Sequence, residues 1–239
     1  MTTIPTLRVM GYTAFLTMYI TNIYYMDWHS RKLRNTTDER LLAFKDLRNR
    51  FFTTWTFMIQ IGYMFFALLC DIYILRNLRK RAFVFPKLIA ELREVIFTGI
   101  VWPTSFLVAT IFWGLYNYDR ALIFPEYLDA VLPNISNHII HTMIIPMAVF
   151  ESLLRPRIES DHLFNLFVMT VYILLYLIVL IFTYKERDVW LYPLFEKLYG
   201  TIYFIVLLGI IYGMLIIFYC IQWLLLKRID DKGVYKKVS

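Results

Sequence analysis

The sequence contains little cysteine, with only Cys70 and Cys220 among 239 residues. Both lie inside apolar runs, where a thiol usually packs as a small buried group. Neither a disulfide scaffold nor a thiol-dependent enzyme is indicated. Internal repeats, low-complexity tracts and connections long enough for a separate soluble domain are also missing. No cleavable signal peptide is evident, because the first apolar run, near Met10 to Met26, is long and lacks a small-residue cleavage site.

Apolar residues are what the sequence has in abundance. They make up 59% of the chain, and the mean hydropathy is +0.57, whereas soluble domains contain roughly 45–50% apolar residues. A soluble protein of this size cannot bury so much apolar surface. The net charge of +7 is modest, and membrane proteins keep Lys and Arg near lipid headgroups, so it does not indicate nucleic acid. The composition predicts an all-α, polytopic membrane protein.

We expect a single domain that forms a bundle of six transmembrane helices, because open strands would leave unpaired backbone groups in lipid. Each span needs about 20 residues to cross roughly 30 Å of hydrocarbon. The predicted spans are 9–27, 51–75, 95–118, 135–154, 163–184 and 199–226, followed by a basic C-terminal tail at 227–239. The first and fourth spans carry several polar residues. Pro103 and Pro146 fall inside spans, where neighbouring helices make kinks tolerable.

The loops indicate an orientation. Lys and Arg are slightly more frequent on the side that holds both termini, which favours a cytoplasmic location for that side. Lys236 and Lys237 lie four and three places from the carboxyl end and resemble the dilysine signal for retrieval to the endoplasmic reticulum. A basic tail at the headgroup surface explains them equally well. We expect residence in the endoplasmic reticulum, with the cell surface as the alternative, and both termini in the cytoplasm.

One cluster of polar residues enters the fourth span. Polar groups inside a span are costly, so the segment Asn134–Thr142 is a candidate for function. His138 and His141 are three residues apart and share a helix face. Two imidazoles can bind a metal, but a site needs three or four ligands, and the nearest acid, Glu151, is ten residues beyond His141. A structural hydrogen-bonding pair, or a histidine acting as general base, are the alternatives.

A general base requires a nucleophile, and the second span begins with Thr53, Thr54 and Thr56. Such hydroxyls usually bond back to the helix backbone. With six spans, however, the starts of the second and fourth spans face the same side of the membrane. At about 1.5 Å rise per residue, Thr53 and His141 would lie at depths that match to within several Å. A hydroxyl becomes a good nucleophile when a base within hydrogen-bond reach takes its proton.

The segment from Tyr118 to Glu151 resembles the androgen-induced gene / FAR-17a family without a gap. The positions that carry the resemblance are Tyr118-Asp119-Arg120, Phe124-Pro125, Leu128-Asp129, Pro133, Asn137-His138, His141-Thr142, Pro146 and Glu151. Three other stretches are similar to the family, namely Arg50-Phe51-Phe52-Thr53 with Gln60, then Asp71, and Trp190-Leu191-Tyr192-Pro193 with Glu196. The resemblance runs from about Phe51 to the last span.

Members of that family are six-span membrane hydrolases that use a threonine nucleophile and a histidine. Their substrates are fatty acid esters of hydroxy fatty acids. The resemblance implies that Thr53 is the nucleophile and His141 the base, in an acyl transfer that uses no cofactor or metal. The expected partners are a lipid ester within the bilayer and the membrane lipids.

Several supporting roles are weaker expectations. Asn134 or Asn137 could donate a hydrogen bond to the oxyanion. His138 could orient His141 or bond to a neighbouring helix.

The charged residues near the span ends offer further candidates. Asp119 could steer a histidine or pair with Arg120. Arg50 or Arg120 could bind the free carboxylate of a branched lipid ester at headgroup level.

Two other classes of function stay open. The first is a metal-binding or transport protein built on His138 and His141. Against transport, the spans contain no series of charged residues, and Asp71 lies near the membrane face opposite the histidines. The second is a non-catalytic membrane scaffold, against which the presence of both Thr53 and His141 counts.

Overall fold

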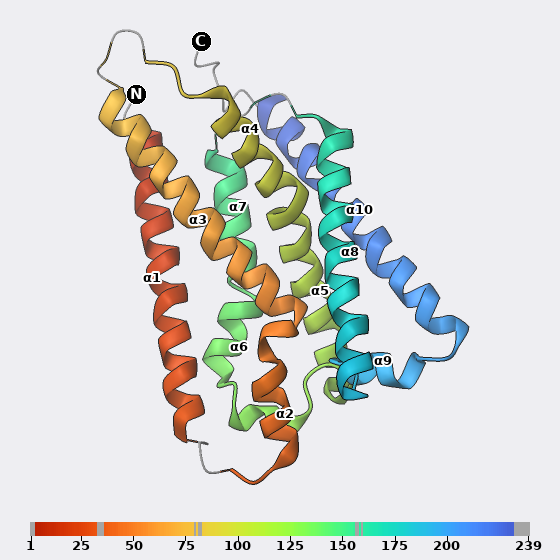
Figure 1. Ribbon diagram of the computed structural model, residues 1–239. Coiled ribbons are helices and arrows are strands. Elements are labelled where there is room, and N and C mark those ends of the chain that lie inside the picture. Colours follow the sequence, from red (N-terminus) through yellow and green to blue (C-terminus); the bar gives the residue numbers. More distant parts are fainter. Residues whose placement is uncertain are drawn as a thin grey trace.

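The computed structural model describes residues 3–32, 36–78, 80, 83–155, 158 and 160–231. Over these residues the chain is a bundle of helices without a strand, as the apolar runs predict (Figure 1). The elements are α1 (Thr3–Lys32), α2 (Glu39–Leu47), the 3-10 helix η1 (Arg48–Arg50), α3 (Phe52–Asn77), α4 (Lys87–Val95), the π-helix η2 (Ile96–Val101), α5 (Trp102–Asp119), the 3-10 helices η3 (Arg120–Leu122) and η4 (Glu126–Ala130), α6 (Asn134–His141), α7 (Ile144–Leu154), α8 (His162–Arg187), α9 (Pro193–Leu198) and α10 (Ile202–Asp231). The predicted all-α class is confirmed.

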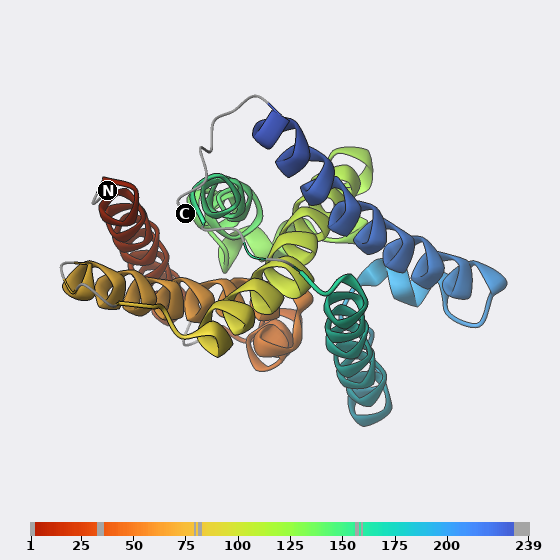
Figure 2. The same cartoon turned by 90° about the horizontal axis from the view of Figure 1, so that it is seen from above.

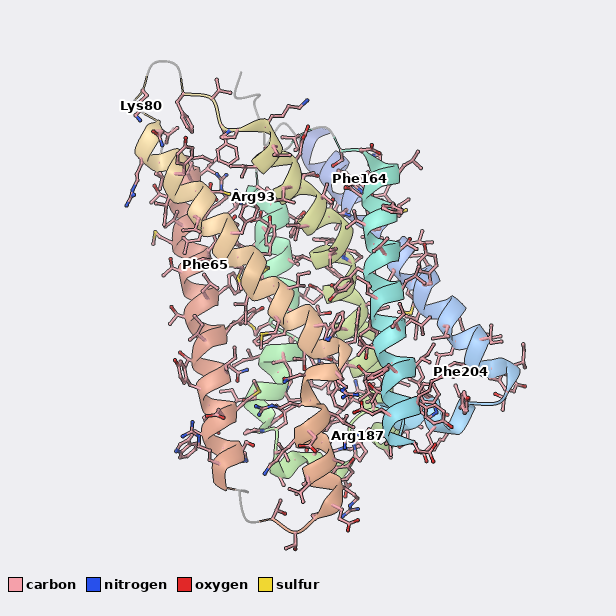
Figure 3. All side chains as sticks on the ribbon, in the orientation of Figure 1. Phe65, Lys80, Arg93, Phe164, Arg187 and Phe204 are labelled. Atoms are coloured by element: carbon pink, nitrogen blue, oxygen red, sulfur yellow. The ribbon has the colours of Figure 1, made fainter. Side chains whose placement is uncertain are left out.

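Five helical segments of the described chain are long and apolar enough to cross a membrane. They are Phe52–Asn77, Lys87–Leu122, Asn134–Leu154, His162–Arg187 and Ile202–Leu225. Large apolar side chains cover their outer faces: Phe65 on α3 is 57% exposed and Phe164 on α8 is 49% exposed (Figure 3). Such surface is stable against hydrocarbon and unstable against water. The chain is therefore an integral, multi-pass membrane protein.

The sixth predicted span, 9–27, corresponds to α1. Its 30 residues give a length of about 45 Å at 1.5 Å per residue, enough to cross a bilayer. Helix α1 lies beside α3 and begins at the end of the bundle where α10 ends (Figure 1). It is less apolar than the five other segments, because it directs Arg8, Asn22 and the hydroxyl of Tyr19 into the bundle. The sixth span stays a prediction.

The third and last membrane helices extend beyond their predicted ends. The third begins at Lys87 instead of 95, because Arg93 and Glu94 are buried in ion pairs and the helix continues through them. A π-helical turn follows and ends directly before Trp102 and Pro103. The last helix continues past 226 to Asp231. The lysines of the predicted retrieval signal, 236 and 237, lie outside the described residues.

A network of buried charges joins four helices near the upper end of the bundle in Figure 3, where Arg93 is labelled. Asp71 of α3 accepts hydrogen bonds from Nε of Arg8 of α1 at 2.9 and 3.0 Å. The same carboxylate pairs with Nη1 of Arg93 at 3.2 Å. The other terminal nitrogen of Arg93 lies 3.0 Å from Oε1 of Glu151 of α7. One arginine thus bridges two carboxylates from different helices.

Further partners complete the network. Glu151 accepts hydrogen bonds from the hydroxyls of Tyr12 and Tyr63, and Glu94 pairs with Arg155 beside them. Three arginines therefore face three carboxylates, and all six side chains are buried. A buried charge is tolerated only when it is paired and hydrogen-bonded, so each of these helices depends on the others for its position.

Removing one charge from this network should destabilise the bundle. We expect Glu151→Gln to lower the free energy of unfolding by roughly 3–5 kcal/mol, because Arg93 then loses a buried partner. Thermal or denaturant unfolding of the purified protein in detergent measures the change. The matched control is Glu91→Gln, which removes an exposed pair with Lys87 and should change stability by about 0.5 kcal/mol or less. Equal stability of the two variants would contradict the role given to the network.

Candidate active site

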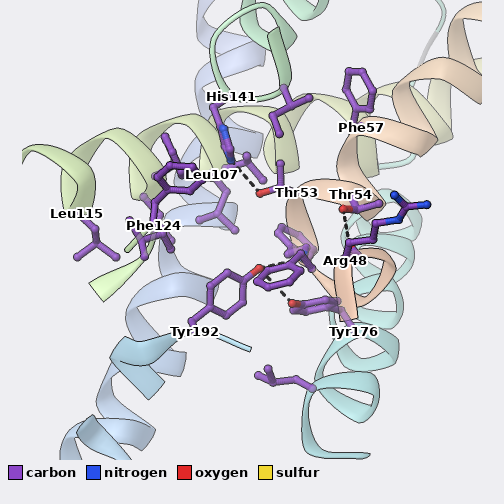
Figure 4. Close-up of a pocket in the computed structure, with 18 of the residues that line it drawn as sticks. Arg48, Thr53, Thr54, Phe57, Leu107, Leu115, Phe124, His141, Tyr176 and Tyr192 are labelled. Atoms are coloured by element: carbon purple, nitrogen blue, oxygen red, sulfur yellow. Dashed lines mark hydrogen bonds between the residues drawn. The ribbon is translucent and has the colours of Figure 1, made fainter. Parts of the chain in front are cut away.

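An apolar cavity of about 950 Å³ opens between the helices at the end of the bundle opposite the charge network. Helices α1, α3, α5, α8 and α10 supply most of its wall, and α2, α6 and α9 contribute fewer residues. Thr53 and His141, from the starts of the second and fourth predicted spans, both line it (Figure 4). The cavity is large enough to enclose most of a lipid-sized ligand.

The side chains of Thr53 and His141 meet inside this cavity. Oγ1 of Thr53 lies 3.3 Å from Nε2 of His141 (Figure 4). The other ring nitrogen, Nδ1, lies 3.0 Å from the backbone carbonyl of Asn137. A carbonyl oxygen only accepts, so Nδ1 carries the proton of the neutral ring and Nε2 is an acceptor. The threonine hydroxyl therefore donates to an unprotonated imidazole nitrogen.

A helix break sets the position of His141. Pro146 has no N–H and cannot continue a regular helix from Thr142. The amide of Met143 bonds instead to the carbonyl of His138, five residues back, at 3.1 Å. Helix α6 therefore ends at His141, and α7 starts three residues later. The imidazole is 4% exposed and stacks on the ring of Phe112, with centroids 3.5 Å apart.

The side chain of Gln60 on α3 forms hydrogen bonds that stabilise this helix break. Its amide donates to the carbonyl of Ile144 at 2.9 Å and to the hydroxyl of Ser105 at 2.7 Å. Its carbonyl accepts from the hydroxyl of Tyr19 at 2.9 Å. Gln60 lies two helical turns after Thr53 on α3. The hydrogen bonds of Gln60 to α1, α5 and α7 therefore fix the position of Thr53 along the helix axis relative to His141.

The three threonines of the second span have different surroundings. The hydroxyl of Thr54 donates to the carbonyl of Arg48 at 2.7 Å. Thr56 is fully buried and is not among the described residues that line the cavity. Of these three described threonines, only Thr53 faces the imidazole of His141.

The first turn of α3 presents hydrogen-bond donors next to the Thr53 side chain. The amide of Phe52 donates to the hydroxyl of Tyr192 at 2.9 Å. Trp55 makes the first backbone bond that closes the helix. In the part of the chain that the structure describes, the amides of Thr53 and Thr54 have no hydrogen-bond partner. These amides stand at the positive end of the helix dipole.

Two tyrosines support this turn from the opposite wall. The hydroxyls of Tyr176 and Tyr192 lie 3.3 Å apart, and both side chains line the cavity (Figure 4). From the sequence, Tyr192 is noted only among the residues that resemble the family, and no role is predicted for it. Neither Tyr176 nor Phe112 stands out in the sequence, because their importance comes from contacts between distant segments.

The predicted supporting residues of α6 do not reach the cavity wall. Asn134 is exposed, and Asn137 is buried and contributes its backbone carbonyl to His141. His138 is exposed and stacks on Trp113, with centroids 4.8 Å apart. Its Nδ1 lies 3.3 Å from the hydroxyl of Thr142. The two histidine rings therefore face different neighbours.

The predicted carboxylate-binding arginines both have acidic partners and do not line the cavity. Arg50 pairs with Glu186 at 2.6 Å. Arg120 pairs with Asp129 at 2.7 Å. Asp119 accepts a hydrogen bond from the backbone amide of Ala121, so its side chain caps the short helix η3.

In the described part of the chain, His138 and His141 are not part of a recognisable metal site. Among the described residues, no three side chains of His, Cys, Asp or Glu lie close enough together to hold a metal ion. Glu151, the acid in the same predicted span, belongs to the charge network at the other end of α7. Transition-metal sites generally need three or four such ligands. The contact that the site does provide is the one between a hydroxyl and an imidazole.

Comparison with known proteins places the chain in a family. No solved structure matches it. It is similar to the androgen-dependent TFPI-regulating protein of Mus musculus, with 29% identity over 175 residues that cover 73% of this chain and 74% of the relative. The Homo sapiens protein of that name is 28% identical over 190 residues, 80% of this chain and 76% of the relative. The androgen-induced gene 1 protein of Homo sapiens is 25% identical over 112 residues, 47% of each chain.

The family match covers more of the chain than the motifs alone suggest. The sequence profile described as FAR-17a/AIG1-like protein matches residues 9–225, which includes α1 as well as the segment after Phe51. Nearly the whole described bundle, with both Thr53 and His141, lies inside this match. The chain belongs to the FAR-17a/AIG1-like protein family.

Proposed function

We propose that this protein is a membrane-embedded hydrolase of lipid esters that uses Thr53 as nucleophile and His141 as general base. One observation supports the proposal most strongly. An unprotonated imidazole nitrogen lies 3.3 Å from a threonine hydroxyl inside an apolar cavity of about 950 Å³. A nucleophile and its base within hydrogen-bond reach, with the base oriented by a third group, is the arrangement that acyl transfer requires.

The proposed reaction has two halves. Oγ1 of Thr53 attacks the ester carbonyl carbon while Nε2 of His141 takes the hydroxyl proton. The carbon–oxygen bond of the ester then breaks, and the alcohol leaves with the proton from the imidazolium. Water attacks the acyl-threonine through the same base, which releases the fatty acid and restores the hydroxyl.

The base is oriented without a carboxylate. The backbone carbonyl of Asn137 accepts from Nδ1 and stabilises the imidazolium that forms during the reaction. The ring of Phe112 holds the imidazole plane from one side. A carbonyl and a stacked ring thus fix the tautomer and the orientation, which are the functions that a triad carboxylate serves elsewhere.

The oxyanion would be bound by the start of α3. The amides of Thr53 and Thr54 are donors beside the nucleophile at the positive end of a helix. Tyr192 fixes this turn through the amide of Phe52. Asn134 and Asn137 are less suitable donors, because their side chains are not on the cavity wall.

The apolar wall favours a substrate with long hydrocarbon chains. The resemblance to the family implies fatty acid esters of hydroxy fatty acids, and the cavity has the volume and character to hold such chains. The names of the curated relatives refer to androgen and to regulation of TFPI, and neither term describes a chemical step. For its location we propose the endoplasmic reticulum membrane, as expected from Lys236 and Lys237.

The nucleophile can be tested by covalent labelling. A fluorophosphonate probe should label membranes that contain the parent protein, and labelling should be lost in Thr53→Ala and His141→Ala. Ester hydrolysis should fall by roughly 10³-fold or more in both, because the two residues act as a unit. Thr13→Ala is the matched control and should keep labelling and activity, since Thr13 is exposed, bonds to a backbone carbonyl and does not line the cavity. Labelling that survives in Thr53→Ala would remove this residue from the role of nucleophile.

The support of the oxyanion site can be tested through Tyr192. We expect Tyr192→Phe to lower kcat by about tenfold, with little change in KM, because the first turn of α3 loses a partner that positions its donors. Steady-state kinetics with one ester substrate measure both constants. Tyr203→Phe is the control, because Tyr203 is 66% exposed and does not line the cavity. An unchanged kcat in Tyr192→Phe would refute the positioning role.

The orientation of the bundle is a separate proposal. If both termini are cytoplasmic, Thr53 and His141 lie near the lumenal or extracellular headgroups. A glycosylation acceptor placed on a flexible insert between α1 and α2 should then be modified. The same insert between α3 and α4 should stay unmodified. The reverse pattern of glycan on the two inserts would invert the orientation.

A further inference from the structure

The cavity wall is not equally closed on all sides. Four large apolar lining residues of the described chain are also exposed, namely Tyr24 of α1, Met58 of α3, Leu174 of α8 and Ile210 of α10. Beside Tyr24 and Met58, helices α1 and α3 pack against each other. Leu174 and Ile210, which are 52% and 54% exposed, lie instead on two helices that diverge (Figure 1). Exposed lining residues on two diverging helices mark an opening. This opening lies between α8 and α10.

The hydrogen bonds between α8 and α10 begin about one helical turn before Leu174 and continue away from the opening. Oγ1 of Thr170 is 2.8 Å from the hydroxyl of Tyr212, and Nδ1 of His162 is 2.9 Å from the hydroxyl of Tyr219. Below this region in Figure 1 the two helices separate, and in Figure 2 they also point in different directions. The cavity reaches the surface between these diverging halves, where the two helices share its wall.

The opening is close to the proposed nucleophile. Tyr176 lies on α8 less than one helical turn from Leu174, and its ring is 4.7 Å from the ring of Phe52. Its hydroxyl pairs with Tyr192, which holds the amide of Phe52. Thr53 is the next residue. A chain that enters beside Leu174 therefore arrives at the turn that carries Thr53.

The chemistry of the opening fits hydrocarbon. Apart from Tyr176 and Tyr212, the described cavity-lining side chains of α8 and α10 are all leucine, isoleucine or methionine. Both helices are among the membrane-spanning segments, so the opening faces acyl chains and not water. A polar solute would lose its hydration on this path, whereas an acyl chain would exchange one apolar environment for another.

The cavity has a second opening, which is lined by polar side chains. Among the described residues, the charged side chains that line the cavity are Asp27, Lys45 and Arg48, at the ends of α1 and α2 and in η1. Arg48 is exposed, so the cavity also reaches the surface at headgroup level. Thr53 and His141 can thus be approached from a polar side and from an apolar side.

We propose that the opening flanked by Leu174 and Ile210 is a lateral portal, through which a long acyl chain passes from the bilayer to Thr53. The protein would then select esters that are dissolved in the membrane and carry long chains. Short, water-soluble esters use the polar opening beside Arg48. This inference rests on the proposed hydrolase function.

Blocking the portal with a large side chain tests the proposal. Leu174→Trp and Ile210→Trp should lower kcat/KM by about tenfold or more for a long-chain ester supplied in phospholipid vesicles. The same variants should hydrolyse p-nitrophenyl acetate with kcat/KM within about threefold of the parent. Leu175→Trp is the matched control: Leu175 is adjacent and 52% exposed, but it does not line the cavity. It should change neither activity.

The outcomes separate the portal from the hydrolase. Retained labelling by a short fluorophosphonate shows that the tryptophan variants are folded. Equal losses for both esters, or no loss for either, would overturn the portal while Thr53 keeps its role. Hydrolysis of both esters by Thr53→Ala would instead overturn the hydrolase proposal, whatever the tryptophan variants show.

Discussion

The break between α6 and α7 determines where the site lies. Pro146 prevents a continuous helix across the fourth span, so α6 ends at His141 and its imidazole projects beside the start of α3. Polar backbone groups at a break are unstable in lipid unless other groups bind them. Gln60 does so here, since it donates to the carbonyl of Ile144 and bonds to α1 and α5. The distance from Thr53 to His141 depends on this arrangement.

The two ends of the bundle have different chemistry. At one end, Asp71, Arg93 and Glu151 form a buried, fully paired network that ties α1, α3, α4 and α7 together. At the other end, α1 and α3 line an apolar cavity together with α5, α8 and α10. Charges that must pair across helices resist separation, so they hold the bundle together where no cavity exists. The opposite end can then stay open to a ligand without loss of the fold.

Much of this structure follows from the sequence. Apolar runs define the membrane helices, and counting residues from the starts of the second and fourth spans puts Thr53 and His141 at similar depth. Composition could not settle the part played by α1, because its polar residues face the bundle. The helix of the third span begins before the predicted span for a related reason. Arg93 and Glu94 interrupt the apolar run, yet both are buried in ion pairs.

The details of the site were harder to predict, because they arise from contacts between distant segments. Phe112 stacks on the imidazole and Tyr192 binds the first turn of α3, and neither contact has a local sequence signal. Arg50 and Arg120 lie near the correct end of the bundle, but each has an acidic partner. A partner many residues away is visible only in three dimensions.

The central claim is that the hydroxyl of Thr53 becomes acylated. Acid quenching during turnover of a long-chain ester, followed by proteolysis and mass spectrometry, measures this directly. The account predicts that the peptide with Thr53 gains the mass of the acyl group, and that this adduct is absent from His141→Ala. Turnover with the adduct on another residue, or with no adduct in a variant whose deacylation is slowed, would contradict it.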